Sequence, residues 1–306
     1  MPAALAISGN TFRESVRQPV YWTIVVITIA LMAMSAIFAA FALGEESKLV
    51  RDAGLTSITI AGVLLAIFLS SSVVADEIEK KTAFTILCKP VHRYQFIFGK
   101  YLGISCAIFI AYIILATGLL LTTWLFESPI KYGAVLGAFF RGGSLDPRFV
   151  NADFPLPDLI GKAVTFSSIL SLLGRDLSAF FSFLFPNLAK GILLSFCEVA
   201  ILSSAALAVS TRASMILNVC ITLSLFVLGH QVGYFLHILS AADTGLLPEI
   251  VRRIVPNFEL LNYASDIAFD KIVPIRLIGQ LIAYTVGWIA VFLLLAIALF
   301  DQREIA

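Results

Sequence analysis

The sequence contains few charged residues. Asp, Glu, Lys and Arg make up only 13% of its 306 residues, whereas 59% are hydrophobic. A soluble domain of ordinary composition carries about 25% charged residues. This chain therefore has too few charged groups to cover a globular surface in water, and lipid must surround most of it. The net charge of +1 also argues against a nucleic-acid partner.

The sequence also lacks the common catalytic and nucleotide-binding motifs. It has no G-x-x-x-x-G-K-[ST] loop, no H-E-x-x-H, no G-x-S-x-G and no C-x-x-C. The four cysteines lie outside the long loops expected at 127–185 and 241–276, so the sequence predicts no disulfide framework. We expect no catalytic, metal or cofactor site in this chain and predict that it is not an enzyme.

Charge is absent over long apolar runs, one of which is broken only by Glu198. A helix needs roughly 20 apolar residues to cross the hydrocarbon core of a bilayer, and each run is long enough. We predict an all-α polytopic membrane protein with a single transmembrane domain over residues 1–306. Its six transmembrane helices are expected at about 18–43, 54–75, 101–126, 188–210, 213–240 and 277–300.

The distribution of basic residues favours cytoplasmic termini. With both termini inside, the cytoplasmic side holds nine Lys and Arg in about 50 residues, against twelve in roughly 110 outside. Region 127–186 is then extracytoplasmic. Its second half is apolar enough for a seventh span, but Arg175 and Asp176 would lie at mid-bilayer at a cost of several kcal/mol. We therefore expect an external helix pair there, broken at Gly174.

Residues 1–19 are expected to form a short amphipathic helix against the membrane, before the first span. Thr11 and Glu14 fit the two ends of a capping box. Arg13 and Arg17 stand one helical turn apart and would face either phospholipid headgroups or a protein. The alternative is a solvated basic tail.

Few ionisable residues lie within the predicted spans. Glu198 is about 12 residues, or roughly 18 Å, from the cytoplasmic end, where a carboxyl group must be protonated, paired or facing a hydrated cavity. It is either functional or hydrogen-bonded to nearby serines or to Asn218. His230 and His237 are seven residues apart and share a helix face, but two ligands do not make a metal site. We expect both histidines to face water or neighbouring helices.

A polar segment, ADEIEKKTAFTILCKPVHRYQFIFGKY at 75–101, separates the second and third predicted spans. A helix that begins near Asp76 would place apolar residues on one face, and charged residues with Phe84 on the other. Pro90 would stop this helix, because proline has no N–H to donate and restricts the preceding residue. We predict a short amphipathic rod at 76–90, parallel to the membrane and suited to a contact with a partner protein.

This segment resembles the coupling-helix region of ABC-2 type transporter permeases, the membrane subunits of a class of ABC exporters. Their usual pattern is an acidic pair with a threonine, a Pro-[aliphatic]-x-Arg turn and a Gly-Lys before the third span. The matching residues are Glu77-Ile78-Glu79-Lys80-Lys81-Thr82, Pro90-Val91-His92-Arg93 and Gly99-Lys100. Lys81 stands where many members have glycine, a departure that affects the local bend before Thr82.

Shorter pieces in the same order extend the resemblance over most of the chain. They are Thr-Phe-Arg-Glu-Ser-Val-Arg at 11–17, Ser210-Thr211-Arg212, Pro256-Asn257-Phe258 and Phe300-Asp301-Gln302-Arg303-Glu304. The N-terminal and coupling segments look closest to the NosY-like branch, which is associated with copper-enzyme maturation. Region 127–185 is longer than in compact members of the family.

The resemblance implies a permease that forms a homodimer in the bacterial cytoplasmic (inner) membrane. Two separate ABC ATPase subunits would bind ATP and Mg and drive export. The residues implied in ATPase coupling are Glu77, Glu79, Lys80, Thr82, Phe84, Pro90, Arg93 and Lys100, the last two holding the rod at the lipid headgroups. The other implied sites are an N-terminal interface helix (Arg13, Glu14, Arg17), a translocation path (Glu198, Asn218) and an outer gate (Pro248, Pro256, Asn257, Phe258).

Two other classes of protein stay open. A membrane scaffold that anchors an enzyme or an assembly complex would need neither an ATPase partner nor an outer gate. An intramembrane enzyme would need a catalytic cluster, and the spans offer only Glu198 and two distal histidines. The apolar spans fit a lipid-like or amphipathic cargo and lipid-facing surfaces equally well, so the sequence does not identify a substrate.

Overall fold

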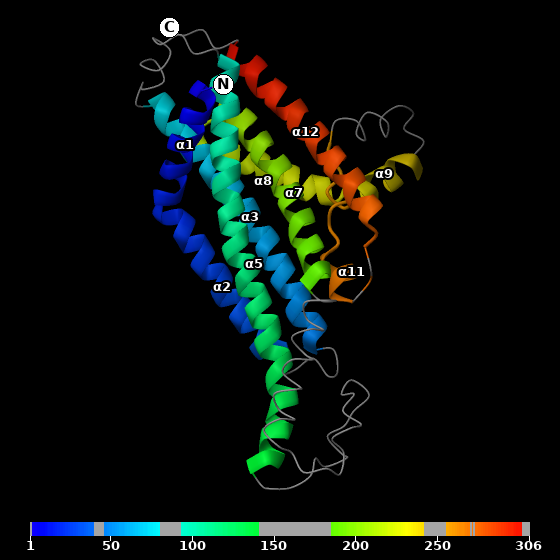
Figure 1. Cartoon of the computed structure of the whole chain (residues 1–306). Helices are drawn as coiled ribbons and strands as arrows, with labels where there is room; N and C mark the ends of the chain where they lie inside the picture. The colour runs from blue at the N-terminus through cyan, green and yellow to red at the C-terminus, as the bar shows by residue number, and fades with distance from the viewer. Residues whose placement is uncertain are drawn as a thin grey trace.

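A computed structural model describes most of the chain. The described residues are 2–39, 46–79, 93–140, 185–241, 255–269, 271 and 273–301. Every regular element within these ranges is an α-helix, which confirms the predicted all-α class (Figure 1). In chain order the helices are α1 (Pro2–Arg17), α2 (Pro19–Ala39), α3 (Glu46–Glu79), α5 (Arg93–Phe140), α7 (Phe185–Ser210), α8 (Met215–His230), α9 (Val232–Ala241), α11 (Ala264–Ala268) and α12 (Ile275–Asp301).

Four of the described helices are long and apolar enough to cross a membrane by themselves, namely α3, α5, α7 and α12. The count rises to six if each of two bent helix pairs is one span. The pair α1 and α2 is bent by 59°, and the pair α8 and α9 by 65°. The chain is therefore a multi-pass membrane protein, while the exact limits of its spans stay predictions.

The bend between α1 and α2 lies at Gln18, directly before Pro19. Proline removes a backbone donor and disfavours helical geometry in the residue before it. The first helix is amphipathic, as its 16 residues suggested, and turns away from the axis of the first span. The structure thus separates an N-terminal helix from the first span where the sequence predicted it.

Two helices extend further than the sequence predicted. The helix α3 continues through Asp76 to Glu79, so no new helix begins near Asp76. The physical reason is that no glycine or proline lies between Gly62 and Pro90, and glutamate is a good helix former. The helix α5 continues through Pro129 to Phe140. This helix thus extends past the predicted span limit at 126, because one proline removes a single hydrogen bond without ending a long helix.

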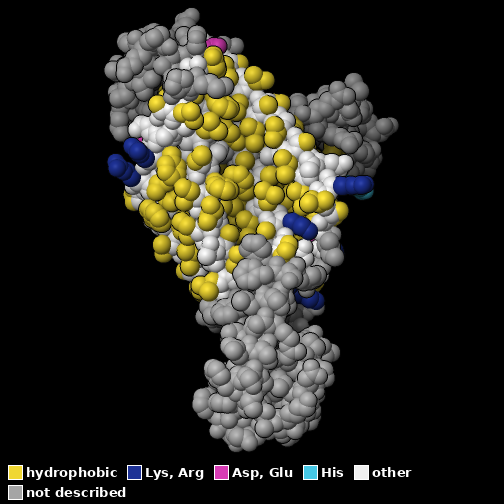
Figure 2. All heavy atoms as spheres, in the orientation of Figure 1, with side chains coloured by type: hydrophobic (Ala, Val, Ile, Leu, Met, Phe, Trp, Pro, Cys, Tyr) yellow, Lys and Arg dark blue, Asp and Glu magenta, His cyan; other side chains and the backbone are white. Residues whose placement is uncertain are grey.

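The centre of the bundle is formed where α3, α5 and α7 pack together. Their contacting faces carry many small residues, and Ala66, Ala107, Ala111 and Ala206 are completely buried. Apolar side chains gain little by leaving lipid, so helices in a membrane associate through close packing of such residues. Figure 2 shows hydrophobic side chains covering the middle of the drawn face, with Lys and Arg at its margins. This surface is the one expected to face acyl chains.

The helix α1 packs against the beginning of α5 through two glycines in the run Gly-Lys-Tyr-Leu-Gly. A Cβ atom at Gly99 would stand 2.9 Å from the Ala4 carbonyl oxygen, and one at Gly103 would stand 2.7 Å from the Ser8 carbonyl oxygen. Thr11 also contacts Gly103 and is buried in the middle of α1. The predicted capping box is therefore wrong, because Thr11 is a packing residue within a continuous helix.

Candidate functional site

Most of the predicted coupling residues lie at the edge of the described chain or outside it. Lys80, Thr82, Phe84 and Pro90 are outside the described residues, as is Pro248 of the predicted gate. The backbones of Glu77 and Glu79 belong to the end of α3, and Arg93 begins α5. Arg13 and Arg17 are exposed on α1, with Glu14 half-buried between them.

Lys100 is the coupling residue whose side chain the structure places in full. It is 1% exposed, and its Nζ lies 5.6 Å from the centre of the Phe96 ring. Such an arrangement is a cation–π contact. The expectation that Lys100 faces lipid headgroups is therefore wrong, since the side chain points into the protein.

Three elements meet beside Lys100 at the end of the bundle where α1 also lies (Figure 1). The Phe96 ring of α5 stacks on the Phe300 ring of α12, with centroids 5.8 Å apart. Arg212 follows α7 and donates from Nε to the Leu299 carbonyl at 3.1 Å. A cation at the last carbonyls of a helix is favourable, because these groups lack partners within the helix. This contact joins two sequence pieces that are 87 residues apart.

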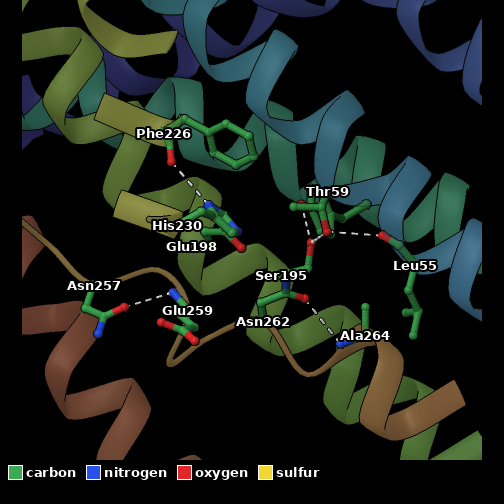
Figure 3. Close-up of polar contacts among 11 residues, drawn as sticks. Leu55, Thr59, Ser195, Glu198, Phe226, His230, Asn257, Glu259, Asn262 and Ala264 are labelled. Carbon is green, nitrogen blue, oxygen red and sulfur yellow. Dashed lines mark hydrogen bonds and ion pairs between the residues drawn. The ribbon is translucent and has the colours of Figure 1, made fainter. Parts of the chain in front are cut away.

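Deeper in the bundle, Glu198 of α7 faces His230, the last residue of α8 (Figure 3). Glu198 is 1% exposed, and its Oε1 lies 3.4 Å from His230 Nε2. The other ring nitrogen, Nδ1, lies 3.2 Å from the Phe226 carbonyl oxygen. We call Glu198 and His230 the central pair. The residue that faces Glu198 is thus His230, whereas the sequence predicted the nearby serines or Asn218.

A break in the helix follows His230 directly. Gln231 ends α8, and its N–H donates to the Val227 and Leu228 carbonyls at 3.2 and 3.1 Å. The next helix, α9, leaves at 65°. The predicted common face of His230 and His237 is therefore wrong, because the bend points them in different directions and leaves His237 exposed.

The Pro256–Phe258 segment packs on this break. The Phe258 N–H donates to the Gly229 carbonyl at 3.0 Å, and a Cβ at Gly229 would overlap the buried Phe258 ring. The Asn257 N–H donates to the Tyr284 hydroxyl at 2.7 Å, which ties the segment to α12. The Phe258 and His230 rings have centroids 6.0 Å apart. The predicted gate segment thus contacts the end of α8, while gating itself stays a prediction.

Asn218 belongs to a separate polar cluster near the beginning of α8. Its Nδ2 donates to Ser71 Oγ of α3 at 2.7 Å, and Thr222 Oγ1 donates to its Oδ1 at 3.2 Å. All three side chains are buried. The structure therefore does not bring Asn218 and Glu198 together as a single site.

Sequence reasoning missed a cluster of three hydroxyls, which we call the hydroxyl cluster. Ser195 Oγ lies 2.8 Å from Thr59 Oγ1 of α3 (Figure 3). It also lies 2.9 Å from the Tyr112 hydroxyl of α5, so it joins α7 to both helices. A Cβ at Gly62 would stand 2.8 Å from the Tyr112 ring, so the glycine makes room for the tyrosine. Ser195 is three residues from Glu198 and shares its helix face, which was the available signal.

Within the described residues, no group of three or more His, Cys, Asp or Glu lies together in a way that could hold a metal ion. The arrangement instead offers charge pairing and hydrogen bonding between helices. Buried polar groups inside a membrane protein contact one another because lipid cannot hydrogen-bond them. The central pair and the gate segment are therefore the candidate functional site.

Comparison with models of protein families matches residues 5–305 to one described as an ABC-2 family transporter protein. The match covers nearly the whole chain, including most of α1, the polar segment and α12. Comparison with curated proteins gives no match.

Proposed function

Because the chain belongs to the ABC-2 family of transporter proteins, we propose that it is the permease subunit of an ATP-driven exporter. Separate ABC ATPase subunits, two per transporter, bind ATP and Mg and supply the energy. A second copy of the permease completes the transporter as a homodimer. The family match supports a permease with ATPase partners; export and the composition of the complex are parts of the proposal.

The proposed mechanism rests on contacts that α7 and α12 make at separate points along their lengths. Near one end, Arg212 and Leu299 join these helices. About 18 Å away along α7, Glu198 faces His230. Further back along α12, Tyr284 holds the gate segment at Asn257. A displacement of one end of α7 and α12 is therefore transmitted to the contact between α8 and the gate segment.

The proposed orientation places α1, the end of α3 and the end of α12 at the cytoplasmic face of the inner membrane. The ATPases dock there, on the polar segment that follows α3. In this account Glu77, Glu79, Lys80 and Phe84 contact the ATPase, while Thr82 and Pro90 shape the segment. A conformational change requires a contact that differs between two states, and an ATPase that closes on ATP supplies one.

The proposal is tested by uncoupling. The full chain is reconstituted into liposomes with its ATPase, and ATP hydrolysis is measured with transport over a panel of candidate substrates. We expect Phe84→Asp to leave the ATPase bound or weakly bound but to abolish substrate-stimulated hydrolysis and transport. The reason is that an apolar ring at a protein contact is replaced by a charge that must be desolvated.

Phe269→Asp is the matched control, because Phe269 is exposed and lies beside α11, at the end of the bundle opposite α1 (Figure 1). A complex with Phe269→Asp should couple ATP hydrolysis to transport as the wild type does. Normal transport by Phe84→Asp would refute the assigned contact. Failure of the chain to co-purify with any ATPase would refute the exporter and favour a membrane scaffold.

A further inference from the structure

The central pair is buried in a way that the transporter function does not by itself explain. Glu198 is 1% exposed and lies roughly in the middle of α7. Its Oε1 has no hydrogen-bond partner within the described residues, although His230 Nε2 lies 3.4 Å away. His230 lies at the end of α8, where the helix breaks. Burial of a carboxyl group in these surroundings is unfavourable unless a proton or an opposite charge compensates it.

The Phe226 carbonyl determines which nitrogen of His230 carries a proton. A carbonyl oxygen only accepts hydrogen bonds, so at 3.2 Å His230 Nδ1 is the donor. Nε2 then faces Glu198 Oε1 either as a bare acceptor or, in the imidazolium, as a second donor. In the first case the proton lies on the carboxyl group, and in the second on the imidazole. Both favourable arrangements contain one proton between the two atoms.

We propose that Glu198 and His230 together bind one proton, and that this proton holds the end of α8 against α7. The atoms are 3.4 Å apart, slightly beyond the usual hydrogen-bond range, so a shared proton shortens the contact. Without the proton, a bare nitrogen and a carboxylate face each other while buried. That state is relieved when the end of α8 moves away from α7.

The gate segment is coupled to this movement. The Phe258 N–H is bonded to the carbonyl of Gly229, the residue before His230. The rings of Phe226 and Phe258 flank the imidazole, with centroids 4.6 and 6.0 Å from it. Release of the proton therefore loosens α8 and the gate segment together. The proposal rests on the proposed function for its role in transport, but the proton site itself does not.

Other titratable groups face the central pair and must be controlled. Glu259, the residue after the gate segment, lies beside α9, with a carboxylate oxygen 2.6 Å from where a Cβ of Gly233 would stand. Tyr112 of α5 contacts Ser195, three residues from Glu198, Tyr284 of α12 accepts from the Asn257 N–H, and Cys197 is adjacent to Glu198 on α7. Of these, only Glu259 is, like Glu198, a carboxylic acid. It is therefore the matched control for Glu198.

The test is nitrogen NMR of the full chain in lipid nanodiscs, with selectively ¹⁵N-labelled histidine, across a pH titration. The His230 signal is assigned by its loss in His230→Gln. Glu198→Gln keeps the side-chain shape but removes the negative charge that stabilises the imidazolium, and its amide N–H can donate to the bare Nε2. We expect this variant to lower the proton affinity of His230 by at least about tenfold, a midpoint shift of about one pH unit. Glu259→Gln should shift it much less.

The exposed His237 serves as an internal control, because an unchanged signal from it in all variants shows that the fold is intact. An unchanged His230 midpoint in Glu198→Gln would overturn the shared proton. The proposal would also be overturned if Glu259→Gln shifted the His230 midpoint as much as Glu198→Gln does. A general electrostatic effect of nearby carboxylates would then explain the shift.

The claim that the central pair holds the end of α8 against α7 is tested by amide hydrogen exchange at one fixed pH. His230→Phe should speed exchange in 226–241 and 255–263 by roughly tenfold, the factor expected when about one hydrogen bond is lost. Glu198→Gln, which retains a donor, should exchange like the wild type. Equal exchange in wild type and His230→Phe would show that the pair does not hold α8. Neither measurement needs an ATPase or a substrate. If NMR shows the shared proton but the reconstituted complex does not transport, only the exporter proposal is refuted.

Discussion

At the scale of the residue, Ser195 ties three helices together. Its hydroxyl group lies within hydrogen-bond distance of Thr59 on α3 and Tyr112 on α5. Because the Thr59 hydroxyl donates to the Leu55 carbonyl, Ser195 can donate to Thr59 Oγ1 and accept from Tyr112, so both contacts can form at once. Hydrogen bonds between membrane helices are worth about 0.6 kcal/mol on average, because the unfolded chain also finds partners. The hydroxyl cluster therefore specifies helix register more than it adds stability.

A double-mutant cycle tests this account of the hydroxyl cluster. We expect Ser195→Ala and Tyr112→Phe each to lower the free energy of unfolding in detergent by about 1 kcal/mol. Their coupling energy should be near 0.6 kcal/mol. Thr117→Val is the control, because Thr117 is exposed and bonds only the Ile113 carbonyl of its own helix. Additive effects, with no coupling, would show that the Ser195–Tyr112 contact contributes nothing.

At the scale of the element, the placement of α1 depends on the surface of α5. The carbonyls of Ala4 and Ser8 approach α5 where Gly99 and Gly103 have no side chains. The buried Thr11 fills the remaining space. The whole of α1 is therefore held against the same helix that begins after the polar segment. Motion of the polar segment should reach α1 through α5.

Replacement of Gly103 by leucine should separate these two helices. Overpacking typically costs about 1–3 kcal/mol, and here the new side chain would meet the backbone of α1. We expect a lower unfolding temperature in detergent and faster proteolysis of the first 17 residues. Gly287→Leu, on α12, is the matched control, since nothing lies within 4 Å of a Cβ there. Equal effects of the two substitutions would contradict the docking of α1.

At the scale of the whole molecule, the sequence predicted the helices better than their contacts. Charge-free runs located the long apolar helices, because lipid solvation depends on composition. The bend after His230 was missed, although Gly229 and Gly233 flank it and were the available signal. The pairing of Glu198 with His230 depends on how α7 and α8 are rotated and how deep they lie. Those quantities come from packing between helices, which a single sequence does not record.

Local motifs failed where tertiary packing overrode them. Thr11 and Glu14 matched a capping box, but the glycines of α5 favour a continuous α1 with Thr11 buried. Asp76 resembled a helix start, but the good helix formers around it let α3 continue to Glu79. Lys100 looked like a headgroup anchor from its place at the end of a span. In the structure the Phe96 ring offers it a buried cation–π contact instead.

The central claim is that ATP turnover in a partner moves α8 relative to α12, and with it the contact between α8 and the gate segment. Its most direct test is a spin-label distance measurement on the assembled complex in nanodiscs. The labels replace two exposed residues, Leu228 of α8 and Val291 of α12. They are introduced after the exposed Cys106 and Cys220 are changed to serine, with labelling at any further reactive cysteine checked in the parent.

We predict that trapping with ATP and Mg shifts the distance distribution relative to the nucleotide-free complex. The same labels combined with Phe84→Asp should show no shift, although the ATPase still binds ATP. An unchanged distribution in the wild-type complex, with ATP hydrolysis in progress, would contradict the account.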